Sequence, residues 1–474
     1  MRSLDISPEE FRHLAQKVVE LSTEYLATMD SLATFPPVNG PATEQRFHTP
    51  RPEQGSGVNA LADLAEIVGY SRIQNGRFFG YVLGSGEPVA AAADLFASVL
   101  NQNLTAWRSG PAAITIERTV VEWIAQALGC DSFVGSLTGG GSSANLAGLA
   151  MAREAKLAVN EIGLAEQKRC TVYMSQEAHM SIGKSVALLG MGRDNLRLIE
   201  VDDEFRISPA ELDRAITNDE ANGSVPVAII ASAGTVNTGA IDPLVQISEI
   251  AKRHGCWFHI DGAYGALAAI AAPEKFAGLN LADSLSLDPH KWLYQPLDCG
   301  CLLYRDSQVA RRTFSHTGDY AKSLATDPIE GFEFFDQSIE LSRRFRALKL
   351  WLSLRYHGFK AFRNSIREDL DLAQLLARSI QSNDQLELLA PVPLSAVCFR
   401  FRGTGHHSNA DLDGINVAIL KRVLARGRVY LSNATIGGMF ALRACIVNHR
   451  TTEADVHEIV HEVISSANEI VAHI

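Results

Sequence analysis

The feature that most constrains the fold is a regular alternation of short apolar runs and helix-length segments that begins near residue 88. The runs expected to form strands cover residues 170–175, 196–201, 226–232, 256–260, 283–287 and 299–304. The segments expected to form helices cover residues 111–128, 144–159, 180–190, 208–217 and 243–254. Strands separated by helices of about 10–15 residues are typical of βαβ units and a mainly parallel sheet. Ligands of such sheets bind at the carboxyl ends of the strands, so residues that follow each strand are the first site candidates.

The rest of the chain predicts two further parts. Residues 1–87 are expected to form an N-terminal helical segment, residues 88–350 a large α/β domain, and residues 351–474 a smaller α+β domain. In the first part, the pattern predicts a helix over 7–32, irregular structure to about residue 57, and a helix from Val58 to Ile67. A long helix is expected over 342–357. The third part is expected to contain helices 360–382, 412–426 and 452–471, and strands 387–401, 428–432 and 440–447.

Composition argues against several classes of partner and location. The net charge of −11 disfavours nucleic acid or an anionic membrane as the main partner. No run of residues has the length and apolar character of a membrane span, and residues 1–20 lack the apolar core of a signal peptide. Seven scattered cysteines fit a reducing, cytoplasmic setting better than a disulfide framework. Cys299 and Cys301 have no second cluster at ligand spacing, so we expect buried thiols and no metal site.

Two residues at the ends of predicted strands carry the strongest chemical signal. Lys291 follows an apolar run and stands beside His290 in Asp-Pro-His-Lys-Trp (288–292). Asp261 ends another strand-like run, 30 residues upstream of Lys291. An amine that forms an imine and a carboxylate that keeps a pyridine nitrogen protonated are what an enzyme using pyridoxal 5′-phosphate (PLP) needs. The plainer alternatives are a solvated lysine and an aspartate that caps the next turn.

Three neighbouring features suit a flat, phosphorylated cofactor. The segment Leu-Thr-Gly-Gly-Gly-Ser-Ser-Ala-Asn (137–145) opens a helix, where glycines, free N–H groups and serine hydroxyls can bind an anion. It matches neither a Walker loop nor a dinucleotide fingerprint, and its plainer alternative is a flexible turn with a serine cap. Ala263 is small enough to lie under a flat ring, and His179, after strand 170–175, can stack on the ring's other face.

With these residues in view, the chain resembles the group II PLP-dependent decarboxylases, particularly the aromatic-L-amino-acid decarboxylase branch. The resemblance runs from about residue 60 to the C-terminus and rests on motifs at 177–181, 259–264, 288–292 and 342–351. It implies an α/β fold of the aspartate-aminotransferase type (fold type I), in an obligate homodimer with active sites at the subunit interface, to which the N-terminal segment contributes. It also implies decarboxylation of an L-amino acid, with an aromatic side chain as the leading expectation, to an amine and CO2.

The resemblance assigns roles to individual residues. Lys291 holds PLP, Asp261 pairs with the pyridine nitrogen, and His179 stacks on the ring and contacts the substrate carboxylate. The other cofactor-binding positions are Gly141, Ser142, Thr235, Ala263 and His290. The substrate-side positions are Tyr81, Trp107, Phe334 and Arg443.

Several positions depart from the family pattern. Asp288 stands where the animal aromatic decarboxylases have asparagine, which puts its phosphate contact in question. Val236 replaces the second threonine of the usual Gly-Thr-Thr, so one hydrogen bond near the cofactor is missing. Residues 82–84 and 105–106 are less bulky than in the animal enzymes, which leaves an acidic or aliphatic substrate as an alternative.

The loop before Ser342 decides the expected fate of the carbanion. Counting back from Arg343, Phe334 aligns with the tyrosine that decarboxylases use to reprotonate Cα. In plant relatives, phenylalanine there accompanies oxygen-dependent aldehyde formation, because a carbanion without a nearby acid survives to meet O2. The alternatives are that the ungapped count is wrong, since loops tolerate insertions, or that another acid such as Tyr320 or His316 serves. A catalytically silent fold relative would need a broken lysine–aspartate–histidine set, and all three residues are present.

Overall fold

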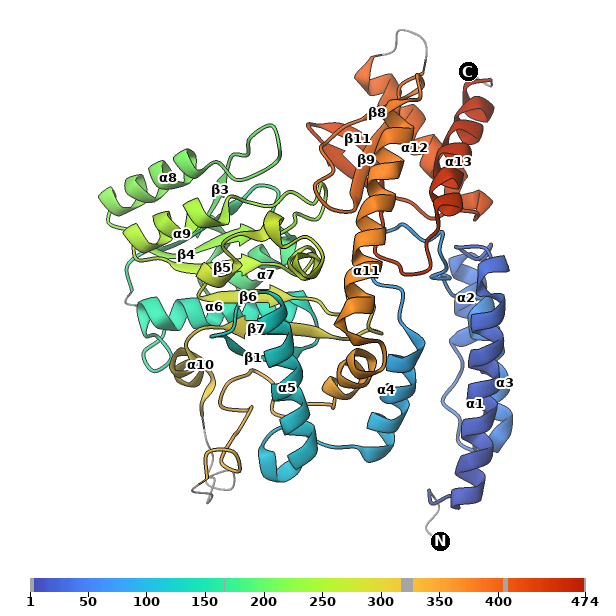
Figure 1. Ribbon diagram of the computed structural model, residues 1–474, viewed down its shortest axis with the longest axis horizontal. Helices are drawn as coiled ribbons and strands as arrows, with labels where there is room; N and C mark the ends of the chain where they lie inside the picture. The colour runs from blue at the N-terminus through green and yellow to red at the C-terminus, as the bar shows by residue number, and fades with distance from the viewer. Residues whose placement is uncertain (1–3, 166, 317–326, 404–407, 473–474) are drawn as a thin grey trace.

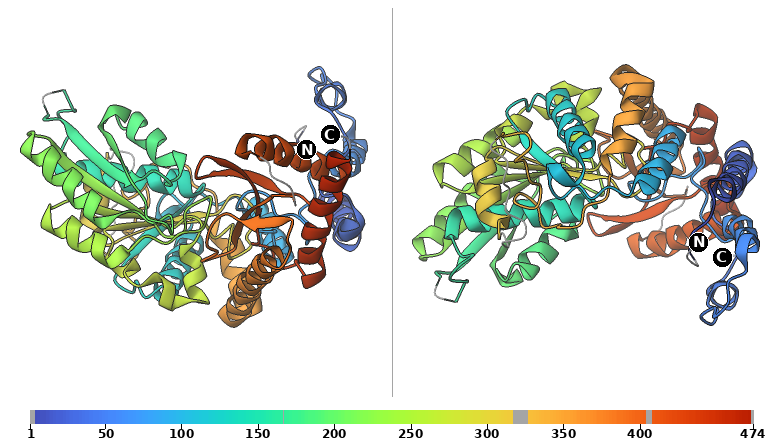
Figure 2. Two further views of the ribbon diagram at one scale, coloured as in Figure 1. Left: turned by 90° about the horizontal axis from the view of Figure 1, so that it is seen from above. Right: turned by 90° about the horizontal axis from the view of Figure 1, so that it is seen from below.

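The computed structural model describes residues 4–165, 167–316, 327–403 and 408–472. It contains a large α/β unit, a smaller α+β unit and an N-terminal helical segment (Figure 1). Seen from above and below, the smaller unit lies between the large sheet and the N-terminal helices (Figure 2). No helix within the described ranges has both the length and the apolar character needed to cross a membrane.

The large unit is built on a seven-stranded sheet in the order β1-β7-β6-β5-β4-β2-β3. The strands are β1 (Val134–Thr138), β2 (Cys170–Ser175), β3 (Leu196–Ile199), β4 (Val225–Ser232), β5 (Trp257–Asp261), β6 (Ser284–Leu287) and β7 (Gly300–Tyr304). The five strands from β6 to β3 are parallel, while β7 runs antiparallel to both β6 and β1. The predicted mainly parallel sheet is therefore confirmed.

Helices cover both faces of this sheet, which explains why a central strand such as β4 is apolar along most of its length. The helices are α5 (Pro111–Ala127), α6 (Gly141–Leu157), α7 (Met180–Leu188), α8 (Pro209–Ala221), α9 (Leu244–Arg253) and α10 (Ser307–Phe314). Along β4, Ile229 and Ala231 pack with buried residues of α5, α8 and α9. Ala228 and Ile230 point to the other face and pack with residues of α6, α7 and α10.

The N-terminal segment consists of α1 (Pro8–Thr28), α2 (Gly40–Phe47) and α3 (Ala62–Gly69), and α4 (Pro88–Leu100) leads into the large unit. Ser7 caps α1 in a capping box with Glu10. The prediction of irregular structure over 40–47 was wrong. Asn39 accepts a hydrogen bond from the N–H of Ala42, and Pro41 suits a first helical turn, so this polar stretch begins a helix.

The smaller unit packs α12 (Asn409–Arg426) and α13 (Glu453–Val471) on a four-stranded antiparallel sheet in the order β10-β11-β9-β8. Its strands are β8 (Leu386–Leu388), β9 (Ala396–Phe401), β10 (Ser432–Ile436) and β11 (Met439–Cys445). The predicted strand 428–432 is misplaced, because Tyr430 bridges to Phe78 instead and the ladder begins at Ser432.

One long element, α11 (Ala347–Gln381), joins the two units. It changes direction at Gly358, whose φ of 74° is non-helical, so the predicted helices 342–357 and 360–382 form two arms of one element. The helix α11 runs without a break through residues 350 and 351. The division of the chain into domains at residues 87 and 350 therefore remains a prediction.

Candidate active site

A cavity of ≈ 330 Å³ lies at the carboxyl ends of the parallel strands. Every residue predicted to be catalytic or to bind the cofactor lies along its wall: Gly141, Ser142, His179, Thr235, Asp261, Ala263, His290 and Lys291. Asp261 ends β5, and each of the others follows a strand. Because β1 runs antiparallel to β7, and β7 antiparallel to β6, β1 also points its carboxyl end at this edge. The sheet topology therefore brings together residues that lie far apart in the sequence.

The glycine segment forms a narrow cradle at the start of α6. The helix begins at Gly141, three residues before the predicted start at 144, and Gly140 adopts a φ of 132° that favours glycine. A Cβ on Gly141 would lie 2.6 Å from the Cβ of Ala263, so a side chain there would collide. The first amides of a helix have no intrahelical acceptor and point outward, which suits a phosphate group.

Asp261 is buried and held by three hydrogen-bond donors. The Asn145 side-chain amide donates to Oδ2 at 2.9 Å, while the Ser286 hydroxyl and the N–H of Ala263 donate to Oδ1 at 3.1 and 3.2 Å. Only 7% of the residue is exposed. Three donors stabilise the negative carboxylate that a protonated pyridine nitrogen requires.

A second layer of side chains fixes these donors. His259 Nε2 lies 2.9 Å from Asn145 Oδ1, and His259 Nδ1 lies 2.8 Å from the Ser284 hydroxyl. Burial lowers the pKa of His259 to about 4, so the imidazole is neutral at pH 7. With its oxygen held by His259, the Asn145 amide turns its N–H toward Asp261.

Sequence reasoning did not assign roles to Asn145 or Ser286. Asn145 stands one turn after Gly141 in α6, and therefore on the same helix face. Ser286 lies directly opposite Asp261 in the parallel register of β5 and β6. Helix periodicity could have identified Asn145 from the sequence. Ser286 could be identified only from the register of the two strands.

Lys291 and Asp288 form an ion pair at the bottom of the turn that follows β6. Lys291 Nζ lies 2.9 Å from Asp288 Oδ2, and His290 Nε2 lies 3.5 Å from the same oxygen. His290 Nδ1 accepts a hydrogen bond from the N–H of Cys299 at 3.3 Å, and burial lowers the pKa of His290. The neutral ring therefore carries its proton on Nε2, facing Asp288.

His179 and Thr235 complete the wall of the cavity. His179 caps α7, with Nδ1 accepting from the N–H of Ser181 at 3.2 Å, and burial lowers the pKa of His179. Thr235 Oγ1 accepts from the N–H of Ala240 at 3.1 Å, which closes the turn after β4. The imidazole is thus a neutral ring fixed at the cavity edge.

These residues fit PLP. The cradle excludes a Cβ, Ala263 leaves room for a flat ring, and Asp261 supplies a buried, fully hydrogen-bonded carboxylate. Among the described residues, Lys291 supplies the only lysine amine along this wall. Asp288 Oδ1 is buried and has no hydrogen-bond partner among the described residues, which leaves one polar atom for a bound group to satisfy.

The predicted substrate-side residues do not line this cavity within the described single chain. Arg443 is buried, and its guanidinium donates to the carbonyls of Val236, Asn237 and Tyr81 at 2.5, 3.2 and 3.1 Å. It braces the loop that carries Val236 into the wall, so the expected approach to a substrate carboxylate is not seen. Tyr81 is half-exposed, and its hydroxyl lies 3.2 Å from that of Tyr430.

Phe334 lies in the core of the same subunit, 1% exposed. The Arg343 guanidinium stacks 4.1 Å from its ring centroid and pairs with the buried Glu117 at 2.5 Å. Trp107 lies nearby, and its backbone N–H donates to the backbone carbonyl of Phe332 at 3.0 Å. The placement of Phe334 beside a substrate is therefore not seen in this conformation.

The loop offers two other acids, His316 and Tyr320. His316 is not among the residues of the cavity wall, and Tyr320 lies outside the described residues.

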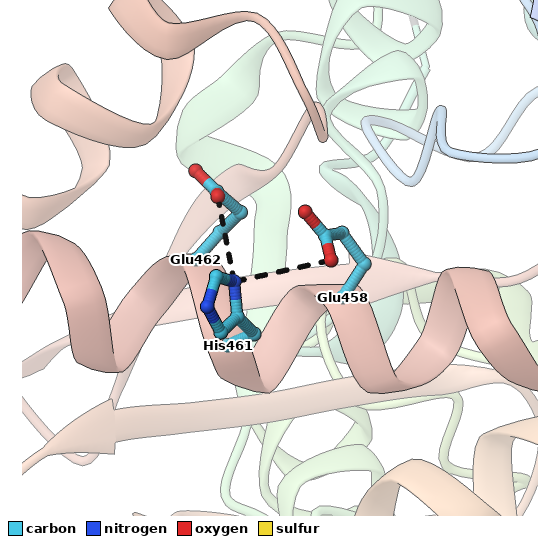
Figure 3. A group of neighbouring side chains, drawn as sticks. All are labelled: Glu458, His461 and Glu462. Atoms are coloured by element: carbon cyan, nitrogen blue, oxygen red, sulfur yellow. Dashed lines mark ion pairs between the residues drawn. The ribbon is translucent and has the colours of Figure 1, made fainter.

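A second cluster of possible metal ligands lies on α13, where Glu458, His461 and Glu462 face one another (Figure 3). Arginines already neutralise both carboxylates. Arg426 Nε lies 2.7 Å from Glu462, and Arg428 lies 2.6 Å from Glu458. We therefore assign no metal to it.

All seven cysteines are buried free thiols, as predicted for Cys299 and Cys301.

Comparisons with known proteins agree with this geometry. Residues 56–402 match the family described as the pyridoxal-dependent decarboxylase conserved domain. An aromatic-L-amino-acid decarboxylase of Bacillus atrophaeus is 34% identical over 474 residues, covering 99% of this chain and 98% of that protein. The crystal structure of Oryza sativa TDC with PLP and tryptamine superposes with a TM-score of 0.92 at 27% identity, covering 99% of both chains.

A structure whose name states a different reaction is also similar. Rhodiola rosea 4-hydroxyphenylacetaldehyde synthase superposes with a TM-score of 0.89 at 27% identity, covering 98% of this chain and 99% of that one. The match to the family extends over most of the sequence, and the predicted fold class is confirmed. The chain belongs to the pyridoxal-dependent decarboxylase family, and it is an amino-acid decarboxylase that uses pyridoxal 5′-phosphate.

Proposed function

We propose that the protein decarboxylates an aromatic L-amino acid to its amine and CO2, as a cytoplasmic homodimer. One observation carries the proposal: the amine of Lys291, the braced carboxylate of Asp261 and the glycine cradle of α6 meet in a single cavity. The aromatic substrate is supported by the relatives, since the Bacillus atrophaeus protein is an aromatic-L-amino-acid decarboxylase. The cytoplasmic setting is supported by seven buried free thiols.

The roles of the residues follow from their positions. When bound, PLP supplies an electron sink for the bond that breaks at Cα. Lys291 would hold the cofactor through its amine. Asp261 would keep the proton on the pyridine nitrogen. The Asn145 amide fixes the orientation of the Asp261 carboxylate by donating a hydrogen bond to it. His179, a neutral ring at the cavity edge, would stack on the cofactor and contact the substrate carboxylate.

The homodimer is supported by surfaces that one chain leaves open. The α4 side chains Leu95, Phe96, Val99 and Leu100 are 40–56% exposed. None of the residues of α1, α2 and α3 is buried in the single chain. Neighbouring exposed apolar side chains on one helix favour contact with a second subunit, and the aromatic side of the substrate pocket would then come from the interface.

The oxygen-dependent alternative depended on Phe334. That side chain is 1% exposed and stacked under Arg343, so in this conformation it has no free surface to line a pocket of either subunit. The identity of residue 334 therefore gives no reason to expect a long-lived carbanion. Decarboxylation without O2 is supported instead by the relatives, since the Bacillus atrophaeus protein is an aromatic-L-amino-acid decarboxylase.

Product analysis across a panel of substrates tests the proposal. We expect tryptophan, tyrosine, phenylalanine or dopa to give amine and CO2 in equal amounts, without O2 uptake or ammonia. Glutamate and 2,4-diaminobutyrate should have a kcat/KM at least about 10-fold lower, which is the discrimination that an apolar pocket commonly achieves. Ammonia and O2 uptake that match CO2 would establish aldehyde synthesis instead, and faster turnover of glutamate would contradict the aromatic assignment.

A further inference from the structure

A chain of buried side chains runs behind the cavity from strands β5 and β6 to Asp261. The Trp257 indole N–H donates to the Ser284 hydroxyl oxygen at 2.8 Å, and that hydroxyl lies 2.8 Å from His259 Nδ1. His259 Nε2 lies 2.9 Å from Asn145 Oδ1, and Asn145 Nδ2 donates to Asp261 Oδ2 at 2.9 Å. All five residues are buried. Because water cannot replace a lost partner here, each hydrogen bond depends on its neighbours in the chain.

The two ends of this chain fix the direction of every hydrogen bond in it. An aspartate carboxylate only accepts, so Asn145 turns its N–H toward Asp261 and its oxygen toward His259. Burial lowers the pKa of His259 to about 4, so the neutral ring carries its one proton on Nε2, and Nδ1 accepts from the Ser284 hydroxyl. At the other end, the indole N–H of Trp257 only donates. Both ends therefore require the same arrangement of protons.

A glycine in α6 makes room for the histidine of this chain. Gly148 stands about one turn after Asn145, and a Cβ built on Gly148 would lie 2.7 Å from Cε1 and 2.8 Å from Nδ1 of His259. A side chain at this position would displace the ring, because the surrounding core is close-packed. The helix that forms the glycine cradle therefore also holds the ring of His259 in place.

The second N–H of the Asn145 amide leads to His179 on the cavity wall. It donates to the Ser181 hydroxyl oxygen at 3.1 Å, and that hydroxyl lies 2.8 Å from His179 Nδ1. The backbone N–H of Ser181 also donates to Nδ1, so Nδ1 carries no proton and accepts from the hydroxyl as well. Burial lowers the pKa of His179, and the neutral ring therefore carries its proton on Nε2, at the edge that faces away from Ser181.

We propose that Asn145 is a positioning residue for both the cofactor and the substrate. One of its N–H groups aligns the Asp261 carboxylate with the pyridine nitrogen. The other, through Ser181, keeps the Nε2–H of His179 available to the substrate carboxylate. His259 acts by holding the Asn145 amide in this orientation. The inference rests on the proposed roles of Asp261 and His179.

A double-mutant cycle on the Kd of PLP for the apoenzyme tests the arm that leads to Asp261. His259→Leu should raise this Kd by about 5- to 20-fold, because it leaves the Asn145 oxygen buried without a donor. His259→Gln, whose amide N–H can take the place of Nε2–H, should stay within about threefold of wild type. In an Asn145→Ala background, His259→Leu should change the Kd by less than about twofold, because its effect passes through Asn145.

His254→Leu is the matched control for His259→Leu. His254 also lies just before or within the β5 region of the chain, but its ring pairs with Asp213 and Glu220, away from the cavity wall. This variant should leave the Kd of PLP within about twofold of wild type, as for most changes away from a site. Thermal melting of each apoenzyme shows whether the variant is folded.

Ser181→Ala tests the arm that leads to His179. It should lower kcat/KM for the amino acid that reacts fastest by about 3- to 10-fold, because His179 loses one of the donors that hold it. The Ki of the product amine, which lacks the carboxylate, should change by less than about twofold, and so should the Kd of PLP. Ser181→Thr keeps the hydroxyl and should restore kcat/KM to within about threefold of wild type.

Two results would overturn the proposal. One is a rise in the Kd of PLP with His259→Leu that is equally large in the Asn145→Ala background, since His259 would then act through the backbone of β5. The other is an equal effect of Ser181→Ala on the amino acid and on the product amine. If Asn145→Ala does not fold, His259→Gln and His259→Leu decide instead, and equal Kd values for these two variants would overturn the proposal. Wild type that decarboxylates no amino acid would refute the proposed function, whereas the cycle on the Kd of PLP would still decide the inference.

Discussion

Replacing Lys291 with alanine should lower turnover by about 10⁴-fold or more, the order of loss seen when a covalent catalytic group is removed. It should also abolish the absorbance at about 420 nm that PLP acquires when it forms an imine with a lysine amine. Both effects are expected because, in the part of the chain that the structure describes, no other lysine lines the cavity. Both readouts come from one purified protein, with a spectrum and a CO2 assay.

Lys184→Ala is a suitable control for this substitution. Lys184 lies on α7, close enough to act on His179 electrostatically, but it is exposed and is not part of the cavity wall. Its loss should leave turnover within about twofold of wild type, as for most surface changes. A Lys291→Ala enzyme that keeps both the absorbance and the activity would refute the assignment of Lys291.

Asp261→Asn should have the second largest effect. The change keeps the shape of the side chain but removes its charge, so nothing holds the proton on the pyridine nitrogen. We expect kcat to fall by about 10²- to 10⁴-fold, as when a positioned acid–base or charge partner is lost. The absorbance near about 420 nm should persist, because Lys291 still holds the cofactor. The measurement is kcat at saturating PLP, together with the spectrum.

Ser286→Ala provides a graded comparison for Asp261→Asn. It removes one of the three donors to the carboxylate and leaves the charge in place. A smaller loss of about 3- to 10-fold follows from losing one charge-assisted hydrogen bond. Full activity of Asp261→Asn would show that the carboxylate does not support the cofactor ring.

The sequence predicted the cofactor side of the site because parallel strands end at a common edge. Lys291, Asp261 and His179 each follow an apolar run, and that local signal alone places them together. The side chains that hold Asp261 in place, Asn145 and His259, are marked by no such local pattern. Asn145 and Asp261 are 116 positions apart, and His259 reaches Asn145 over 114, so only the packed structure reveals the contact.

The substrate side was harder to predict, because a motif gives the position of a residue but not the direction of its side chain. Arg443 stands where the family pattern suggests, but the carbonyls of Val236 and Asn237 bind its guanidinium. Phe334 follows the loop pattern, and the stacked Arg343 holds it in the core. Strand β1 (Val134–Thr138) was missed because its few apolar residues alternate with glycine and polar residues.

The most direct test of the central claim is to fix the cofactor on the residue that holds it. Reduction of the PLP-loaded protein with borohydride, followed by proteolysis and peptide mass mapping, shows which amine carries the pyridoxyl group. The account predicts one modified peptide, with the label on Lys291 in Asp-Pro-His-Lys-Trp (288–292). A label on another lysine, such as the buried Lys349 or the exposed Lys184, would contradict it.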